Sequence, residues 1–86
     1  MIKLKSGMIM KEKVVNYVRI HTKDGKIHKL PKEKLHISYE GAGLERIAVI
    51  EIETEITLEQ VMKLSLINYS GDSVYNYYAG DSYKVY

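Results

Sequence analysis

Apolar and polar residues alternate most clearly between Arg46 and Ile56. One side of this segment collects Ala48, Ile50, Ile52 and Ile56, and the other collects Glu51, Glu53 and Glu55. A period of two is typical of a β-strand with one buried face. Ile47 and Val49 make the first half apolar on both sides, which predicts that this half is covered on both faces. The pattern therefore predicts a strand over residues 46–56 with a glutamate-lined face.

A second strand signal spans Val14–Thr22, which is rich in β-branched and aromatic residues. The turn residues Lys23-Asp24-Gly25 follow and lead into the β-prone segment Ile27–Leu30, which predicts a hairpin. Two registers are open, a two-residue Asp-Gly turn or a three-residue loop that pairs Val18 with Leu30. We favour the three-residue loop because it gathers the apolar residues of both strands on one face.

Pro31 is expected to end the second strand of this hairpin, because proline cannot donate to the hydrogen-bond ladder. Leu35, Ile37 and Tyr39 then alternate with polar residues and predict a third short strand. The segment 40–43, Glu-Gly-Ala-Gly, is typical of a flexible turn before the glutamate-lined strand.

A helix is predicted over residues 57–67. Thr57 and Gln60 match the capping box that satisfies free amides at a helix start. Apolar or small residues then fall at helical spacing, namely Leu58, Val61, Met62, Ser65, Leu66 and Tyr69. The alternative, which the sequence leaves open, is that residues 63–69 extend as a strand.

The C-terminal region contains a short repeat, in which Tyr69–Ser73 is echoed by Tyr78–Ser82. Each copy carries a Gly-Asp pair that marks a turn. Val74–Tyr78 and Tyr83–Tyr86 are β-prone, so a tyrosine-rich C-terminal hairpin is expected.

The expected fold class is therefore α+β, a small antiparallel sheet of four or more strands with one short helix packed on it and a tyrosine-rich C-terminal hairpin. Residues 1–86 suffice for one hydrophobic core and are too few for two, so a single domain is expected. No stretch approaches the roughly 18 apolar residues of a membrane span, and we expect a cytoplasmic protein. Because cysteine is absent, stability must come from packing or from a second subunit, so a homo-oligomer is one alternative.

Charge is unevenly distributed along the chain, although the net charge is only +2. Residues 1–34 carry +7, residues 35–60 carry −5, and residues 61–86 are balanced. Lysines of the first region can contact phosphates without reading sequence. One hypothesis is therefore nucleic-acid binding through the basic hairpin, by Arg19, Lys23, Lys26, Lys29, Lys32 and Lys34. The modest total charge and the scarcity of arginine, which usually reads bases, weigh against it.

The segment Asn16–Ile27 resembles the first hairpin of LytTR-type DNA-binding domains. The resemblance covers this segment alone, because the second strand-and-loop block of that family, with its Arg, His and Ser pattern, has no counterpart downstream.

No catalytic, cofactor-binding or metal-binding residue is expected. The triplet Gly-Asp-Ser occurs at 71–73 and 80–82, but a nucleophilic serine needs a neighbouring base, and all three histidines lie far upstream. Two of them, His21 and His28, point to opposite faces in the favoured hairpin register, and His36 adds no known zinc spacing. We therefore expect a protein that is not an enzyme.

The hypothesis favoured by the sequence is a protein-binding module. Tyrosine supplies a large rigid contact area with a polar tip, and six of the eight tyrosines lie after residue 68. The candidate contact residues are Glu51, Glu53, Glu55, Tyr69, Tyr75, Tyr77, Tyr78, Tyr83 and Tyr86. The chain is rich in Lys, Ile and Tyr, which AT-rich codons encode. Small proteins with this composition are common in phages and mobile elements, so an anti-CRISPR-like inhibitor or adaptor is the expected role. A further alternative is an oligomer that sequesters a small ligand such as a nucleotide.

Overall fold

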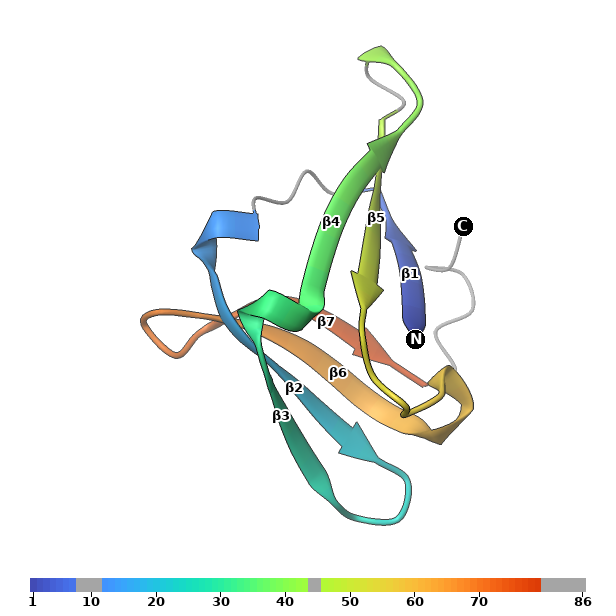
Figure 1. Ribbon diagram of the computed structural model, residues 1–86, viewed down its shortest axis with the longest axis vertical. Coiled ribbons are helices and arrows are strands. Elements are labelled where there is room, and N and C mark those ends of the chain that lie inside the picture. Colours follow the sequence, from blue (N-terminus) through green and yellow to red (C-terminus); the bar gives the residue numbers. More distant parts are fainter. Residues whose placement is uncertain (8–11, 44–45, 80–86) are drawn as a thin grey trace.

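Two antiparallel β-sheets make up the computed structural model of this chain, which describes residues 1–7, 12–43 and 46–79 (Figure 1). One sheet has three strands in the order β1-β5-β4, and the other has four in the order β3-β2-β6-β7. The strands are β1 (Ile2–Ser6), β2 (Val15–Thr22), β3 (Ile27–Pro31), β4 (Leu35–Glu40), β5 (Ile47–Ile52), β6 (Val61–Asn68) and β7 (Ser73–Tyr78). Short 3-10 turns interrupt them at η1 (Glu12–Val14), η2 (Lys32–Lys34) and η4 (Leu58–Gln60).

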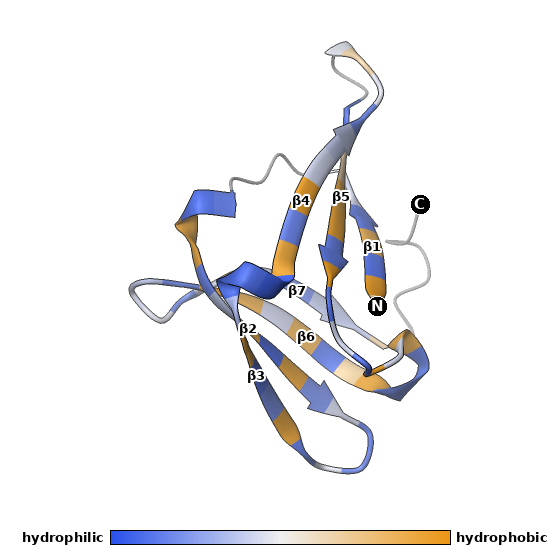
Figure 2. Ribbon diagram, viewed as in Figure 1, coloured by the Kyte–Doolittle hydropathy of each residue, from blue (hydrophilic) through white to orange (hydrophobic). Residues whose placement is uncertain are grey.

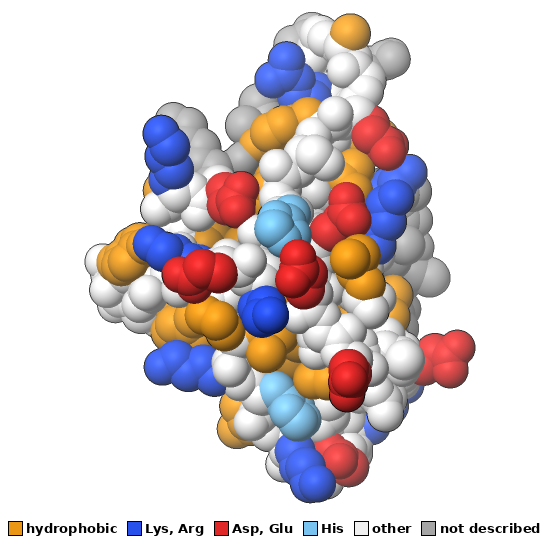
Figure 3. All heavy atoms as spheres, viewed as in Figure 1, with side chains coloured by type: hydrophobic (Ala, Val, Ile, Leu, Met, Phe, Trp, Pro, Cys, Tyr) orange, Lys and Arg blue, Asp and Glu red, His pale blue; other side chains and the backbone are white. Residues whose placement is uncertain are grey.

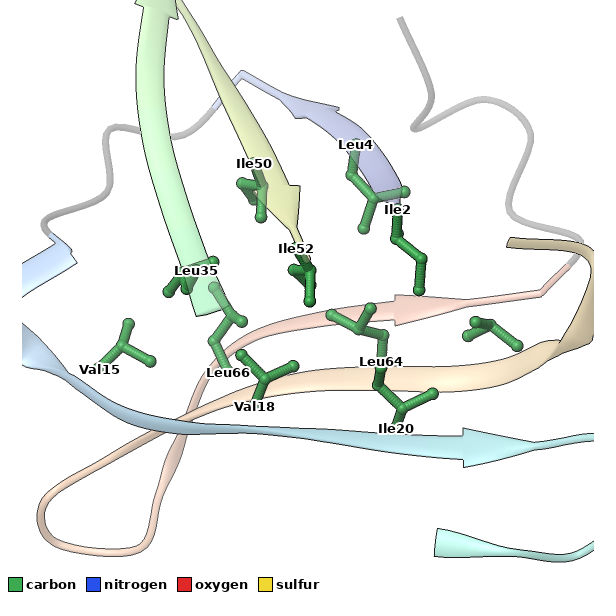
Figure 4. Close-up of a cluster of buried hydrophobic side chains, with 11 residues drawn as sticks. Ile2, Leu4, Val15, Val18, Ile20, Leu35, Ile50, Ile52, Leu64 and Leu66 are labelled. Atoms are coloured by element: carbon green, nitrogen blue, oxygen red, sulfur yellow. The ribbon is translucent and has the colours of Figure 1, made fainter. Parts of the chain in front are cut away.

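The hydrophobic core lies between the two sheets (Figure 4). Leu4 and Ile50 point from the three-stranded sheet toward Val18 and Leu64 of the four-stranded sheet. Each of these side chains is at most 1% exposed. The full cluster is Ile2, Leu4, Val15, Val18, Ile20, Leu35, Ile50, Ile52, Val61, Leu64 and Leu66. Alternation of apolar and polar residues along β1, β4 and β5 places one face of that sheet in this core (Figure 2).

The predicted three-residue hairpin loop between β2 and β3 is confirmed. Val18 pairs with Leu30, and the loop closes with the Thr22 amide donating to the Lys26 carbonyl at 2.9 Å. Gly25 has a φ of +87°, the left-handed conformation that this loop needs and that glycine adopts without steric cost. His21 and His28 consequently lie on opposite faces of the sheet, as the sequence predicts.

The glutamate-lined strand is shorter than predicted, because β5 ends at Ile52. Its first half is covered on both faces as expected. Ala48 is fully buried on the core side, and Val49 is only 2% exposed on the other side.

The predicted helix over residues 57–67 is wrong, and with it the α+β class. The capping signal works locally, since the Gln60 side-chain oxygen accepts from the Thr57 amide at 2.9 Å. The helical conformation lasts for one 3-10 turn, η4. The chain then continues as β6, in which Leu64 and Leu66 share the core face. As a strand, β6 gains ladder partners on both sides, from β2 and β7. In the described residues, every helical element is a three-residue 3-10 turn.

The tyrosine-rich C-terminal region forms a hairpin with β6. The turn lies at residues 69–72, where Gly71 has a φ of +86° and the Asn68 side chain accepts from the Ser70 and Asp72 amides. The expected second turn at 80–82 and strand at 83–86 lie outside the described residues. Across the part of the chain that is described, we find no helix long and apolar enough to cross a membrane.

Candidate functional site

The glutamates of the predicted acidic face are interleaved with lysine and histidine side chains. Glu51 lies in β5 directly between Lys3 of β1 and His36 of β4. Glu53 follows the strand, and its carboxylate lies 2.8 Å from the His36 Nε2 and 3.9 Å from the Lys34 Nζ. Glu55 lies beyond the end of β5, on an exposed bend. Figure 3 likewise shows acidic, basic and histidine side chains interspersed over β4 and β5.

The C-terminal tyrosines divide between the core and the surface. Tyr75 and Tyr77 are half-buried and pack against the hydrophobic core, and burial, together with Tyr77, raises the pKa of the Tyr75 phenol. Tyr69 is 59% exposed, and its hydroxyl accepts a 2.7 Å hydrogen bond from the Lys32 Nζ. This hydrogen bond raises the pKa of Lys32. Tyr78 is exposed at the end of β7. The remaining two candidates, Tyr83 and Tyr86, lie outside the described residues.

The basic residues of the first hairpin also separate in space. Arg19 and Lys29 lie directly opposite each other on β2 and β3. Lys23 and Lys26 lie at the hairpin turn, and the remaining two, Lys32 and Lys34, belong to η2. Of the six predicted phosphate-binding residues, only Arg19 and Lys29 therefore share a sheet face.

That sheet face is the side of the four-stranded sheet turned away from the core, which we call the outer sheet face. Residues alternate sides along a strand, so the strand neighbours of the core residues belong to it, except where the pairing of β2 with β6 is irregular. Its members are Tyr17, Arg19, His21, Ile27, Lys29, Pro31, Lys63, Ser65, Ile67, Asn76 and Tyr78.

Three rows of paired residues cross the outer sheet face, and two of them carry its lysines and Arg19. One row runs Lys29, Arg19, Ser65, Asn76, and the next runs Ile27, His21, Lys63, Tyr78. Neighbouring strands lie about 4.8 Å apart, so the four strands span roughly 14 Å. The face therefore brings β6 and β7 residues beside the basic pair of the first hairpin.

Two cation–aromatic pairs lie on the outer sheet face. The Lys29 Nζ lies 4.3 Å from the centroid of the Tyr17 ring, and the Lys63 Nζ lies 5.5 Å from that of Tyr78. At such distances an ammonium group is attracted to the ring face. The arrangement places a positive charge beside each of two aromatic rings.

The outer sheet face is cationic and carries no carboxylate at its described positions. None of the described Asp or Glu residues forms an ion pair with Arg19, Lys29 or Lys63. The Arg19 Nε and the His21 Nε2 are buried without a hydrogen-bond partner among the described residues. Such atoms cost roughly 1–3 kcal/mol each. The face thus holds positive charge that the described part of the fold does not neutralise.

Sequence reasoning missed Lys63 as a member of this face, and it assigned Tyr78 to a protein-binding surface. The signal that could have found Lys63 is the strand alternative for residues 63–69, because a strand there alternates Lys63 with the buried Leu64. The predicted helix would have removed it from the sheet.

The described residues contain no group of three or more His, Cys, Asp or Glu side chains that could hold a metal ion. No protein-family model, no curated protein and no solved structure matches the chain.

Proposed function

We propose that the outer sheet face binds single-stranded nucleic acid. The observation that supports this most directly is the gathering of Arg19, Lys29 and Lys63 on one sheet face without a carboxylate among its described positions. A surface of one sign attracts a polyanion, and phosphate contacts dominate nucleic-acid affinity. The same charge disfavours pairing of this face with a second copy of itself.

Tyr17 and Tyr78 favour a single strand over a duplex as the ligand. Single-strand-binding proteins combine a positive surface with aromatic rings on which unpaired bases stack. A duplex keeps the faces of its bases inside the stack, so it would engage the cations alone. Lysine gives affinity without base readout, and Arg19 is the one arginine on this face, so little sequence preference is expected.

The first test is the salt dependence of oligonucleotide binding, measured by fluorescence anisotropy with labelled single strands of mixed sequence. Three phosphate contacts give a slope of log K against log salt of about −2, because each single-strand contact contributes about −0.7. Affinity should then fall about 20-fold between 50 and 200 mM salt. A duplex of the same sequence should bind more weakly. Absence of binding, or a flat salt response, would contradict the proposal.

Alanine variants locate the phosphate contacts. Lys29→Ala and Lys63→Ala should each reduce the steepness of the salt slope by about 0.7. The matched control is Lys3→Ala, which removes the same charge beside Glu51 on the other sheet. If the control lowers the slope equally, binding follows total charge and the outer sheet face is not the site.

A tyrosine pair tests stacking separately from charge. Tyr78→Ala should weaken single-strand binding by about 1–3 kcal/mol and leave the salt slope unchanged. Tyr69→Ala is the control, because it removes an exposed tyrosine that lies outside this face. Equal losses in both variants would remove stacking from the proposal.

Docking on a partner protein through Glu51 and Glu53 has less support, since both carboxylates lie beside cationic groups. Affinity capture from host cells distinguishes the two functions. Nucleic acid in the eluate, lost with the Lys63→Ala variant, supports the proposal. A single protein at stoichiometric yield, lost when Glu51 and Glu53 become glutamine, would replace it with the protein-binding hypothesis.

A further inference from the structure

A pocket of about 420 Å³ lies where the β2–β3 hairpin turn meets the connection from β5 to β6. Its described lining is Thr22, Lys23, Asp24, Lys26, His28, Ile56, Glu59 and Gln60. The two walls are tied together, because the Lys23 amide donates to the Gln60 carbonyl at 2.9 Å. In Figure 3, the end of the molecule that carries this turn shows basic, acidic and histidine side chains together.

The two walls differ in chemistry. The hairpin wall presents Lys23, Lys26 and the half-buried His28, together with the Asp24 carboxylate. The opposite wall presents Glu59 and Gln60. Between them lies Ile56, which packs against the hydrophobic core. The pocket thus has one side with two lysines, a histidine and a carboxylate, an apolar residue, and another side with a carboxylate and an amide.

Several polar groups of the pocket are already engaged within the protein. The Asp24 carboxylate accepts from the Thr22 hydroxyl and from the Lys26 amide, and these bonds hold its pKa below the usual range. The Gly25 amide donates to the Thr22 carbonyl. Since these turn amides are used, an anion on this wall would meet the side chains of Lys23, Lys26 and His28.

The opposite wall keeps groups that can contact a ligand. The Gln60 side-chain oxygen is held by the Thr57 amide, which leaves the side-chain NH₂ as a donor. The Glu59 carboxylate is exposed and forms no ion pair with any described residue. Together they offer one donor and one acceptor, a combination suited to the edge of a heterocyclic base.

We infer that this pocket binds a mononucleotide-sized phosphorylated ligand, with the phosphate at Lys23, Lys26 and His28 and the ring over Ile56 beside Glu59 and Gln60. Its volume falls within the range of small-molecule sites. The site is separate from the outer sheet face. His28 pairs with the core residue Ile20, so its side chain lies on the core side of the sheet. It therefore stands independently of the proposed binding of nucleic-acid strands.

Isothermal titration with AMP, adenosine and inorganic phosphate tests this site. AMP should bind more tightly than either of its parts, because it alone spans the phosphate site and the ring site. Lys26→Ala and His28→Ala should each weaken AMP binding about tenfold, the loss of one hydrogen bond to a charged group. Lys29→Ala is the matched control. Lys29 lies on the same strand as His28 but on the opposite face, so this variant should change the AMP affinity by less than about twofold.

Amide chemical shifts locate the ligand in the same samples and show whether each variant is folded. AMP should shift Thr22, Ile56 and Gln60. Shifts at Ser65 and Asn76 instead would assign the nucleotide to the outer sheet face and overturn the inference. No measurable binding at about 5 mM AMP, or an equal loss with Lys26→Ala and Lys29→Ala, would also overturn it. The His28→Ala variant should keep the oligonucleotide affinity of the unaltered protein, which separates the two sites.

Discussion

Leu64 and Met62 belong to the same strand but differ completely in their contact with solvent. Leu64 is fully buried in the core, whereas Met62 is 51% exposed. A register irregularity between the pairs His21–Lys63 and Thr22–Val61 separates them, so the simple alternation of sides is broken at Met62. Residue type alone would have placed both in the core.

This difference predicts unequal costs for the same kind of truncation. Leu64→Ala should lower the free energy of unfolding by about 2–5 kcal/mol, because it removes buried methyl groups and leaves a cavity. Met62→Ala should cost less than about 1 kcal/mol. Urea unfolding followed by circular dichroism measures both, and similar costs would contradict the assignment of core and surface in β6.

Tyr75 predicts how stability changes in alkali. Its phenol has a pKa raised above the ordinary value of 10.0, chiefly by burial. The folded protein therefore holds this proton more tightly than the unfolded chain, so the contribution is complete below about pH 10 and is lost as pH rises through the folded pKa. The Tyr75→Phe variant should lose less stability than the unaltered protein between about pH 9 and 11 in urea titrations. An identical decline in both would rule out Tyr75 as the cause.

At the scale of elements, the β2–β3 hairpin depends on one left-handed glycine. A Cβ on Gly25 would meet no atom within 4 Å, so the cost of Gly25→Ala is conformational. We expect a loss of about 1–2 kcal/mol in the free energy of unfolding. Gly7→Ala is the control, because Gly7 has equal space without a positive φ. A neutral Gly25→Ala variant would show that the loop can change its conformation at no cost.

Local signals predicted the elements that are defined by neighbouring residues. The turn residues before β3 predicted the correct hairpin register, and the alternation in β4 and β5 predicted both strands, although β5 is shorter than predicted. The capping signal of Thr57 and Gln60 was also real, but it produced one 3-10 turn. The segment that follows fits a helical stripe and a strand equally well, and only its strand partners, the distant β2 and the neighbouring β7, decide between them.

At the scale of the whole molecule, folding largely cancels the charge asymmetry of the sequence. Lys3 lies beside Glu51, and the Lys5 Nζ lies 3.1 Å from the Glu40 carboxylate, so the basic start of the chain meets the acidic middle within one sheet. The outer sheet face lacks such partners among its described positions. The candidate site could not be predicted from charge counts, because it depends on which strands become neighbours.

The pairing of β1 with β5 has a consequence for the order of folding. Ile2 pairs with Ile52, and β2 pairs with β6, so both sheets depend on contacts between segments far apart in the chain. The β2–β3, β4–β5 and β6–β7 pairs are local and close only short loops. Because long loops cost more entropy to close, these hairpins should form first and the β1–β5 and β2–β6 pairs should follow, in a reaction of milliseconds to seconds. Until β1 docks, the edge of β5 that it pairs with keeps its hydrogen-bonding groups free. An unpaired strand edge can pair with another chain, so this is a stage at which the chain is exposed to aggregation.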